Sequence, residues 1–454
     1  MSAFTLPAAF NLQPQNELVA FVGGGGKTSL LFALGAALPG RRVLTTTTRI
    51  FAAQMSRAEK VIFFTAEDAK NAEEKIGEAL NEVSLCLVVG GVAGDKAVGV
   101  PPELPGAWLA RPDVDFVLVE ADGSRMRPIK APAAHEPVIP PTSTLVVPVV
   151  GIDALDGRFT EVTHRPEIAA ELLSVMSLRD RFAYGERLSV NDVARLIVHP
   201  QGALKAVPGE ARVIPFINKV ETAAQLTAAR QIAKQLLHTP RIERVVIGAA
   251  KTDQPVREVH QRVTAVVLAA GQGKRMGQTK QLLPWGDTTV LGQTLRNVQQ
   301  TAVHQRLVIT GHEAAAVAAI AQAEEFETLH NPAYNTGEML SSLQTAVRTL
   351  DESVTAVLAI LADQPMVAPA TIDLILAAYW QGSGDLIAPV YEGRRGNPVL
   401  IGRRYFAELL ALPPGDAPRT LLRRHADRLH LVPVPTDDIL RDLDSPEQYR
   451  QERP

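Results

Sequence analysis

The fold is decided by residues 263–284, which read VTAVVLAAGQGKRMGQTKQLLP. The uninterrupted apolar run Val263–Leu268 is typical of a parallel strand that is covered on both faces of its sheet. Small residues follow, and their backbone N–H groups can approach phosphate oxygens closely. These small residues are Ala269, Ala270, Gly271 and Gly273. Because Lys274, Arg275 and Lys280 add three cations at the same point, we expect this strand and loop to hold a triphosphate.

A second opening of this kind lies upstream, where residues 18–28 read LVAFVGGGGKT and an amphipathic segment follows. Two strands that each run into a glycine-rich loop, with strand-like and helical segments alternating throughout, predict an α/β fold in two domains. The polar segment 251–261, which contains Pro255, is the expected linker. We therefore expect the domains to be residues 1–255 and 256–454.

Composition narrows the choice of partners. The formal net charge of the 454 residues is only −3, which gives no reason to expect nucleic acid or an acidic membrane as a partner. The single cysteine, Cys86, lies in an apolar run, and we expect a buried strand thiol. Because there is no secretory signal pattern and no apolar run long enough to span a membrane, we expect a cytoplasmic protein.

Two further motifs of the second domain predict nucleotide contacts. In residues 331–343, NPAYNTGEMLSSL, Gly337 permits close approach, and Ser341 and Ser342 offer hydroxyl groups near a helix start. A plain helix N-cap is the alternative for that motif. Asp363 follows a buried-strand pattern, and ligands of open parallel sheets bind beyond the carboxyl ends of the strands. Asp363 is therefore placed to hold Mg²⁺ on nucleotide phosphates.

Together these motifs resemble the signature of the MobA-like nucleotidyltransferases, and within them the molybdenum cofactor cytidylyl- and guanylyltransferases. The resemblance covers nearly all of residues 262–450 and implies a Rossmann-like α/β domain of the GT-A type. It implies attack on the α-phosphorus of an NTP, with Arg275 and Lys280 steadying the departing pyrophosphate. In the segment DLDSPE at 442–447, it implies that Asp444 is the second Mg²⁺ ligand beside Asp363; a helix-capping turn is the alternative.

The resemblance also implies residues for the acceptor, a molybdopterin-type phosphate. The segment RRGNPVL at 394–400 resembles the Arg-Gly-His-Pro stretch of the family and supplies Arg395, Gly396 and Asn397. Asn397 stands where many relatives carry His, so the acceptor contact at this position departs from the family pattern. Asp416, followed by Arg419, resembles another element near the acceptor.

The glycine loop of the first domain resembles a P-loop, although Phe21 stands where the first glycine of that motif belongs. The glycine N–H groups and a helix N-terminus can form an anion site, Lys27 can reach terminal phosphates, and Thr28 can ligate Mg²⁺. The four glycines of the loop are Gly23, Gly24, Gly25 and Gly26. Asp122 ends an apolar strand as a Walker-B carboxylate does, and we expect it to hold Mg²⁺ through water.

Residues Asn218 and Lys219 begin the segment NKVE, which resembles the guanine-reading Asn-Lys-x-Asp of GTPases with Glu in place of Asp. Together with the later loop Gly248–Lys251, it favours a purine nucleotide, ATP or GTP, in the first domain. The glycine loop, the run TTTTR at 45–49 and the stretch EADGSRMRPIKAP at 120–132 together resemble the YqeC family. That resemblance covers about residues 10–250 and implies an accessory role for selenium-dependent molybdenum hydroxylases, with the hydroxylase apoenzyme as a further partner.

Both domains therefore point to maturation of a molybdenum cofactor. Our first hypothesis is an NTP:molybdopterin nucleotidyltransferase, with CTP favoured over GTP, fused to an ATP- or GTP-binding domain. A sugar-phosphate or polyol-phosphate nucleotidyltransferase is the second hypothesis, because such enzymes share the opening loop. A third hypothesis concerns the first domain alone, which would act as a nucleotide-switched chaperone that binds its nucleotide without transforming it.

Overall fold

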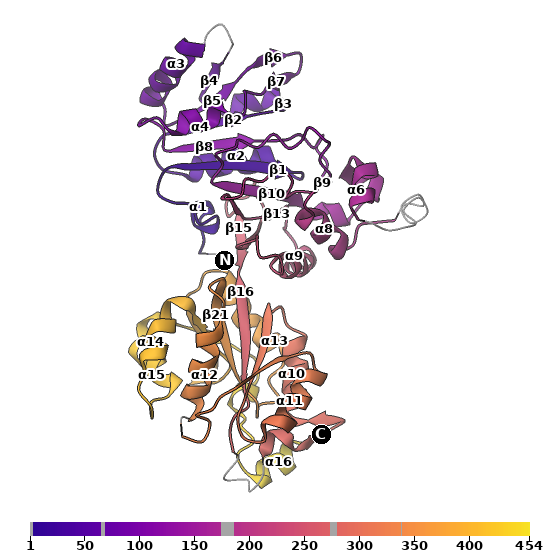
Figure 1. The fold of residues 1–454 in the computed structure, drawn as a ribbon, viewed down its shortest axis with the longest axis vertical. Helices are drawn as coiled ribbons and strands as arrows, with labels where there is room; N and C mark the ends of the chain where they lie inside the picture. The colour runs from indigo at the N-terminus through magenta and orange to yellow at the C-terminus, as the bar shows by residue number, and fades with distance from the viewer. Residues whose placement is uncertain (1–2, 65–68, 174–185, 273–278, 337) are drawn as a thin grey trace. The chain divides into compact units, whose positions relative to one another are not determined.

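The computed structural model describes residues 3–64, 69–173, 186–272, 279–336 and 338–454. The chain divides into two compact units, Met1–His260 and Gln261–Pro454, and each is built around its own sheet (Figure 1). The expected α/β fold in two units is confirmed. Among the described residues, no helix has both the length and the apolar character needed to cross a membrane.

The main sheet of the first unit has ten strands within the described residues, in the order β15-β14-β13-β10-β1-β8-β2-β5-β4, and β12 pairs with β10. Neighbours are parallel except for the edge pair β14 and β15. The strands of this sheet are β1 Glu17–Gly23, β2 Arg42–Thr46, β4 Lys60–Phe63, β5 Leu85–Val89, β8 Phe116–Glu120, β10 Leu145–Gly151, β12 Arg212–Val213, β13 Phe216–Asn218, β14 Val245–Gly248 and β15 Val256–His260.

Two small sheets accompany the main one, with the strand order β3-β7-β6 in one and the pair β9 and β11 in the other. Their strands are β3 Arg49–Phe51, β6 Gly91–Ala93, β7 Lys96–Val98, β9 Ile129–Lys130 and β11 Thr163–His164. The helices of the unit are α1 Leu6–Ala9, α2 Lys27–Ala37, α3 Ala69–Glu82, α4 Leu104–Leu109, α5 Phe159–Val162, α6 Pro166–Leu172, α8 Val190–Val198 and α9 Ala223–Leu236.

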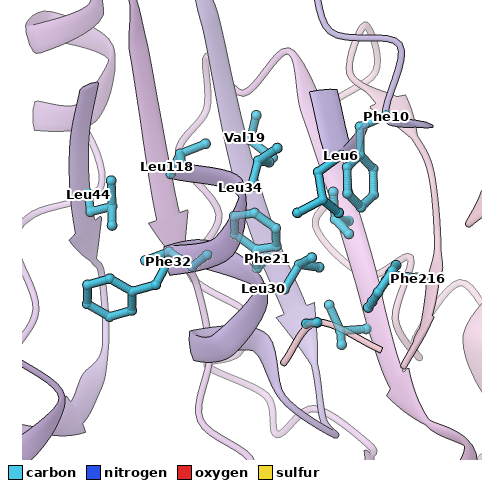
Figure 2. Packing of buried hydrophobic residues seen from close by; sticks show 14 of the residues in the cluster. Leu6, Phe10, Val19, Phe21, Leu30, Phe32, Leu34, Leu44, Leu118 and Phe216 are labelled. Atoms are coloured by element: carbon cyan, nitrogen blue, oxygen red, sulfur yellow. The ribbon is translucent and has the colours of Figure 1, made fainter. Parts of the chain in front are cut away.

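The core of the first unit forms where α2 packs on the central strands. Figure 2 shows Leu30 and Leu34 of α2 beside Val19 and Phe21 of β1, and all four side chains are fully buried. Burying a side chain of this size contributes about 1.5–3 kcal/mol. The strand and the helix on either side of the glycine loop are therefore held in one hydrophobic cluster, which fixes the position of the loop.

The end of the first unit differs from the expected boundary. Residues 256–260, which we assigned to the second domain, form β15 and pair antiparallel with β14. Glu258 is fully buried there, accepts a hydrogen bond from Arg230 Nε at 2.9 Å, and lies 2.8 Å from His260 Nε2. A buried carboxylate needs such partners, so this cluster ties β15 to helix α9 and to the first unit.

The second unit has an eight-stranded sheet within the described residues, in the order β20-β19-β16-β21-β24-β22-β23, with β25 on β22. Strands β20, β19, β16 and β21 run parallel, whereas β24 is antiparallel to both of its neighbours. The strands are β16 Arg262–Leu268, β19 Gln305–Thr310, β20 Glu327–His330, β21 Val354–Leu361, β22 Leu386–Tyr391, β23 Arg394–Arg395, β24 Val399–Gly402 and β25 Leu429–Pro433, and β17 Pro284–Trp285 with β18 Thr288–Thr289 forms a separate pair.

Helices cover both faces of this sheet, with α12, α14 and α15 on one side of the strands and α10, α11 and α13 on the other (Figure 1). Ala265 of β16 packs with α10 and α13, whereas the next residue, Val266, packs with α12 and α14. The expected strand with two covered faces is therefore present. The helices are α10 Val290–Gln299, α11 Ala314–Ala323, α12 Glu338–Thr349, α13 Pro369–Trp380, α14 Phe406–Ala411, α15 Pro418–Arg424 and α16 Pro446–Glu452.

We predict that Cys86 is inert in the folded chain. The thiol is fully buried in β5, and burial raises its pKa to about 12, so only about one thiol in ten thousand is ionised at pH 8. A thiol-specific chromogenic reagent at pH 8 should therefore find no reactive thiol in the native protein and one equivalent after unfolding in guanidinium. Rapid reaction of the native protein would contradict the prediction.

We predict that Glu258→Gln lowers the free energy of unfolding of the first unit by about 3 kcal/mol at pH 7, because it leaves Arg230 without its buried counter-charge. Burial alone opposes ionisation, but hydrogen bonds from His260 and Arg230 lower the pKa of Glu258 to about 2. The depressed pKa stabilises the fold above the ordinary value of 4.5, and this contribution is lost as the pH falls towards 2.

The free energy of unfolding of the first unit is measured at pH 7 and at pH 4 by urea unfolding, with hydrogen exchange of peptides from β14 as the signal. The loss caused by Glu258→Gln should be smaller at pH 4. The matched control is Glu82→Gln, whose carboxylate pairs with Lys60 on the surface and is 62% exposed, so it should cost less than about 1 kcal/mol. Equal losses in the two variants would count against the buried cluster.

Candidate functional site

The candidate site of the second unit lies at the carboxyl edge of its parallel strands. Strands β16 and β21 pair in register up to Leu268 and Leu361, so the residues that follow each strand emerge at the same edge. Ala269 begins the loop after β16, and Asp363 lies two residues after β21. The topology thus brings together two segments that are far apart in the sequence, at the edge where ligands of such sheets bind.

Hydrogen bonds from a neighbouring side chain hold the first part of the predicted triphosphate loop in place. The side chain of Gln281 donates hydrogen bonds to the carbonyls of Ala269 and Gly271, both at 3.0 Å. Ala269 and Ala270 are buried, and Gly271 is exposed at the rim. Gly273 and Arg275, which we expected to complete the loop, lie outside the described residues, as does Gly337. Gln281 is a bracing residue that the loop signature did not single out.

Lys280 lies between two carboxylates. Its ammonium forms an ion pair with Asp363 and a second ion pair with Asp444, at 2.8 Å from Oδ1. The Lys280 side chain is 20% exposed and that of Asp363 is 16% exposed, whereas that of Asp444 is 46% exposed, so the cluster is open to solvent on the side of Asp444. Although burial opposes it, the two carboxylates raise the pKa of Lys280 above its ordinary value. Three residues predicted as catalytic or metal-binding therefore meet at one point.

A third carboxylate, Asp442, stands beside this cluster. It accepts a hydrogen bond from Gln364 Nε2 at 2.7 Å. Burial, and then the neighbouring charge of Asp363, raise the pKa of Asp442 above its ordinary value. The motif DLDSPE therefore brings both of its aspartates to the sheet edge, where both are partly buried. A capping turn is present as well, because Ser445 caps α16 through Gln448.

The serines of the second predicted motif form hydrogen bonds within the protein. Asn331 Nδ2 donates to Ser341 Oγ at 2.8 Å and to Ser342 Oγ at 3.0 Å, and Ser342 is buried. These hydroxyl groups fasten the start of α12 to the loop after β20. Gly311 lies beside that loop, where the backbone of Ala270 and the side chain of Tyr334 leave no room for a Cβ atom. The motif therefore contributes to the candidate site by packing the segments next to the predicted triphosphate loop.

The predicted acceptor residues are only partly brought to the cluster. Asn397 N donates to the carbonyl of Ile439 at 3.3 Å, and Gln364 Nε2 approaches the same carbonyl at 3.4 Å. Gly396 packs so tightly on Ile439 that a side chain there would collide with it. Arg395 is exposed on β23. Asp416 lies in the turn before α15, and no hydrogen bond or ion pair among the described residues joins it to the Lys280 cluster.

The first unit has a comparable edge, where β1 leads into the glycine loop and α2. Three of the loop N–H groups are used inside the protein: that of Gly23 by Asp122 Oδ2, that of Gly24 by the carbonyl of Val149, and that of Gly25 by the carbonyl of Arg127. Gly26 has a φ of 118°, and a side chain there would collide with the amide of Asn218. The loop is therefore bound closely to its neighbours before α2 begins.

A lysine again lies between carboxylates. Lys27 is 3% exposed, donates to the carbonyl of Gly23 at 2.6 Å, and lies 3.2 Å from Asp122 Oδ1 and 3.9 Å from Glu120 Oε1. Lys130 pairs with the other oxygen of Asp122, at 3.2 Å. Asp122, which we expected to hold Mg²⁺, is thus neutralised by two lysines and a backbone N–H group.

Glu120 is a functional candidate that sequence reasoning passed over. Thr28 Oγ1 donates to Glu120 Oε2 at 2.7 Å, so the hydroxyl group predicted as a Mg²⁺ ligand meets this carboxylate instead of Asp122. Burial raises the pKa of Glu120 above its ordinary value. The signal was available in the sequence, because Glu120 is the last residue of the apolar strand β8 and so emerges at the sheet edge.

Asn218 connects the glycine loop to two neighbouring segments. Its amide donates to the carbonyl of Gly25 at 2.7 Å and accepts from the backbone N–H of Ala250 at 2.9 Å. The side chain is 3% exposed, so its main observed contacts are within the protein. Lys219 is half-exposed and pairs with Asp153 at 2.7 Å. The two segments resembling the base-binding elements of GTPases do lie together, beside the glycine loop.

Beyond Asp122 the charged network continues to Glu136, which accepts from Lys130 at 2.7 Å and from Arg165. Burial opposes this, but the two cations lower the pKa of Glu136 to about 2. His164 of β11 lies opposite Lys130 of β9 in the strand register. Burial, and then the charges of Arg165 and Lys130, lower the pKa of His164 to about 4. His164 is therefore neutral at pH 7.

The donor chemistry of the Lys280 cluster suits a hard divalent cation. Mg²⁺ is commonly held by one or two carboxylates together with substrate phosphates and water. Asp363 and Asp444 supply two such carboxylates at one point. Among the residues that the structure describes, no three His, Cys, Asp or Glu side chains are grouped so that they could hold a metal ion by themselves. A cation at this edge would therefore complete its coordination with a ligand.

The two units resemble two different families of known proteins. The model of the family described as YqeC protein matches residues 19–167, and the model described as MobA-like NTP transferase domain matches residues 265–429. YqeC of Escherichia coli (strain K12) is 35% identical over 228 residues, which are 49% of this chain and 84% of that protein.

Two relatives cover the second unit. Molybdenum cofactor cytidylyltransferase of Escherichia coli (strain K12) is 25% identical over 188 residues, which are 41% of this chain and 93% of that protein. Nicotine blue oxidoreductase of Paenarthrobacter nicotinovorans is 28% identical over 198 residues, 41% of this chain and 95% of that protein. The chain belongs to the YqeC family through its first unit, and its second unit, a MobA-like NTP transferase domain, is a nucleotidyltransferase.

Proposed function

We propose that the second unit transfers a nucleotidyl group, CMP in preference to GMP, from an NTP to the terminal phosphate of a molybdopterin-type acceptor. The observation that carries the proposal is the meeting of Lys280, Asp363 and Asp444 beside the loop Ala269–Gly271. This cluster offers one cation and two carboxylates that could hold a metal ion for a triphosphate, and the name of the cytidylyltransferase relative suggests the acceptor class.

The reaction is an in-line substitution at the α-phosphorus. An oxygen of the acceptor phosphate forms the new P–O bond, and the bond from the α-phosphorus to the bridging oxygen breaks, so pyrophosphate leaves with that electron pair. Because the acceptor oxygen is already ionised at pH 7, no protein base is required. The protein contributes positioning and neutralisation of charge, which are large effects when the groups are held in place before the reaction.

Each residue of the cluster has a role in this proposal. Asp363 and Asp444 would hold Mg²⁺, which supplies neutralisation of the phosphate oxygens when it is bound. The N–H groups of Ala270 and Gly271 would approach the triphosphate, and Lys280 would stabilise the charge of the leaving pyrophosphate. By its motif alone, Arg275 would also stabilise the pyrophosphate. By their motifs alone, Ser341, Ser342, Gly273 and Gly337 are kept in the proposal as nucleotide-binding residues.

For the acceptor, we propose the segment Arg395–Asn397. Asn397 and Gln364 share the carbonyl of Ile439, so this segment lies next to the stretch that carries Asp442. The exposed guanidinium of Arg395 suits an acceptor phosphate. Asp416 is kept as an acceptor residue on its motif alone.

For the first unit, we propose an ATP or GTP site that serves maturation of a molybdenum hydroxylase. The support is the connected edge of Lys27, Thr28 and Asn218 around the glycine loop. The N–H groups of residues 26–29 begin helix α2, which offers a positive helix end to phosphate. Glu120 with Thr28 is the better candidate pair for Mg²⁺, and Asp122 positions Lys27 and Gly23.

We predict that Asp363→Asn lowers the rate of nucleotidyl transfer by at least about a hundredfold, because one carboxylate of the charge-neutralising site is lost. The purified full chain is incubated with molybdopterin, Mg²⁺ and either CTP or GTP, and release of pyrophosphate is measured. The matched control is Asp427→Asn, a surface carboxylate of the same unit that is 78% exposed, and it should retain the full rate. Absence of pyrophosphate release from the unmodified chain with either nucleotide would refute the transfer reaction.

We predict that Lys27→Met weakens binding of ATP or GTP to the first unit by about tenfold or more, because the cation nearest the loop is lost. Fluorescent nucleotide analogues titrated into the full chain measure the affinity. Lys60→Met, a surface lysine that pairs with Glu82, is the control and should bind normally.

Thr28→Val is the second variant, because Lys27 is buried among charges and its loss also disturbs folding. It removes only the hydroxyl that meets Glu120, and it should weaken the dependence of binding on Mg²⁺. Tight binding without turnover would favour a switch, whereas turnover that Lys27→Met abolishes would favour an enzyme. Unchanged nucleotide affinity in both variants would refute the site.

A further inference from the structure

The ammonium of Lys280 occupies the space between Asp363 and Asp444. Nζ forms an ion pair with Oδ2 of Asp363 and lies 2.8 Å from Oδ1 of Asp444. A Mg²⁺ or Mn²⁺ ion that bridged the same two side chains would need the oxygens at about 2.1 Å. It would therefore lie in the volume that Nζ occupies, beside a like charge.

We propose that Lys280 and the divalent cation exchange places: Lys280 neutralises the carboxylates in the nucleotide-free protein, and the entering cation displaces its ammonium onto the triphosphate. The proposal rests on the proposed function, since it takes Asp363 and Asp444 as the metal ligands. It adds an order of events to that function. The lysine that stabilises the pyrophosphate becomes available only when the metal position is filled.

The flexible side chain of Lys280 permits this movement. A lysine ammonium is a compact charge on a flexible four-carbon stem, so it can change partner without movement of the backbone. The next residue, Gln281, is buried and holds the carbonyls of Ala269 and Gly271. The backbone at 280–281 is therefore fixed against the phosphate loop. A displaced Lys280 ammonium would remain next to that loop, within reach of a bound triphosphate.

The exchange couples the binding of metal and nucleotide. A cation that enters alone must separate Lys280 from the two carboxylates with which it forms ion pairs, which leaves Asp442 as the one carboxylate named here that remains beside the ammonium. A triphosphate supplies a further counter-charge, so each ligand should strengthen the binding of the other by the same factor. Lys280 thus opposes binding of the metal ion to a site that holds no nucleotide. Once the nucleotide is bound, its ammonium contacts the triphosphate.

The test measures binding of Mn²⁺ to the full chain without nucleotide, from the electron paramagnetic resonance signal of the free ion. The component that disappears in Asp444→Asn is assigned to this site. In Lys280→Met, that component should bind about tenfold tighter, because the competing charge is gone and the carboxylates remain. Addition of CTP should tighten Mn²⁺ binding in the unmodified chain, and by a smaller factor in Lys280→Met.

Two controls separate exchange from a general effect of charge. Arg441→Met removes a positive charge one residue from Asp442, but its guanidinium pairs with Asp437 and Glu452 and does not lie between the two carboxylates. It should change Mn²⁺ affinity by less than about twofold. Lys280→Arg keeps the charge and should bind Mn²⁺ no more tightly than the unmodified chain.

The outcomes distinguish the inference from the proposed function. If Asp444→Asn binds Mn²⁺ as the unmodified chain does, the metal position of the proposed function is wrong, and the exchange fails with it. If Asp444→Asn loses the site but Lys280→Met binds Mn²⁺ with unchanged or weaker affinity, only the exchange is overturned. Equal tightening in Arg441→Met and Lys280→Met would also overturn it, and so would an unchanged effect of CTP in Lys280→Met.

Discussion

In each unit, a lysine that lies between two carboxylates holds the functional edge of the sheet together. Lys27 joins the glycine loop to Glu120 and Asp122 in the first unit, and Lys280 joins Asp363 to Asp444 in the second. The carboxylates at each edge would repel one another without the lysine, and in the first unit, where the pair of Lys27 and Asp122 is buried, removal of one member is strongly destabilising. These lysines therefore offset the repulsion between the carboxylates in the nucleotide-free protein.

The two edges differ in how far their charges are already satisfied. The first unit encloses Lys27, Asp122, Lys130 and Glu136 in one chain of ion pairs, which keeps Asp122 away from a role as an open metal ligand. The cluster around Lys280 is more accessible, and the side chain of Asp444 is 46% exposed. This difference agrees with the two proposals, which are nucleotidyl transfer at the second edge and nucleotide binding at the first.

Much of the fold could be predicted from the sequence because local patterns report local structure. The apolar run before Ala269 predicts a strand covered on both faces, and the packing of Val266 on one face and Ala265 on the other agrees with it. The boundary between the two units could not be predicted from local patterns in the same way. The segment 256–260 is polar enough to suggest a linker, yet Glu258 is buried by partners from α9 and from its own strand.

Residue order alone was enough to establish the fold class, the two glycine-rich loops, and the residue types available for chemistry, since these depend on spacing along one segment. Which side chains meet became clear only in three dimensions. There, Ser341 and Ser342 turn towards Asn331, Thr28 meets the carboxylate of Glu120, and Lys280 lies between two aspartates. The physical reason is that a charge or hydroxyl group takes the best partner within reach, and that reach is set by strand order and register, which residue spacing does not contain.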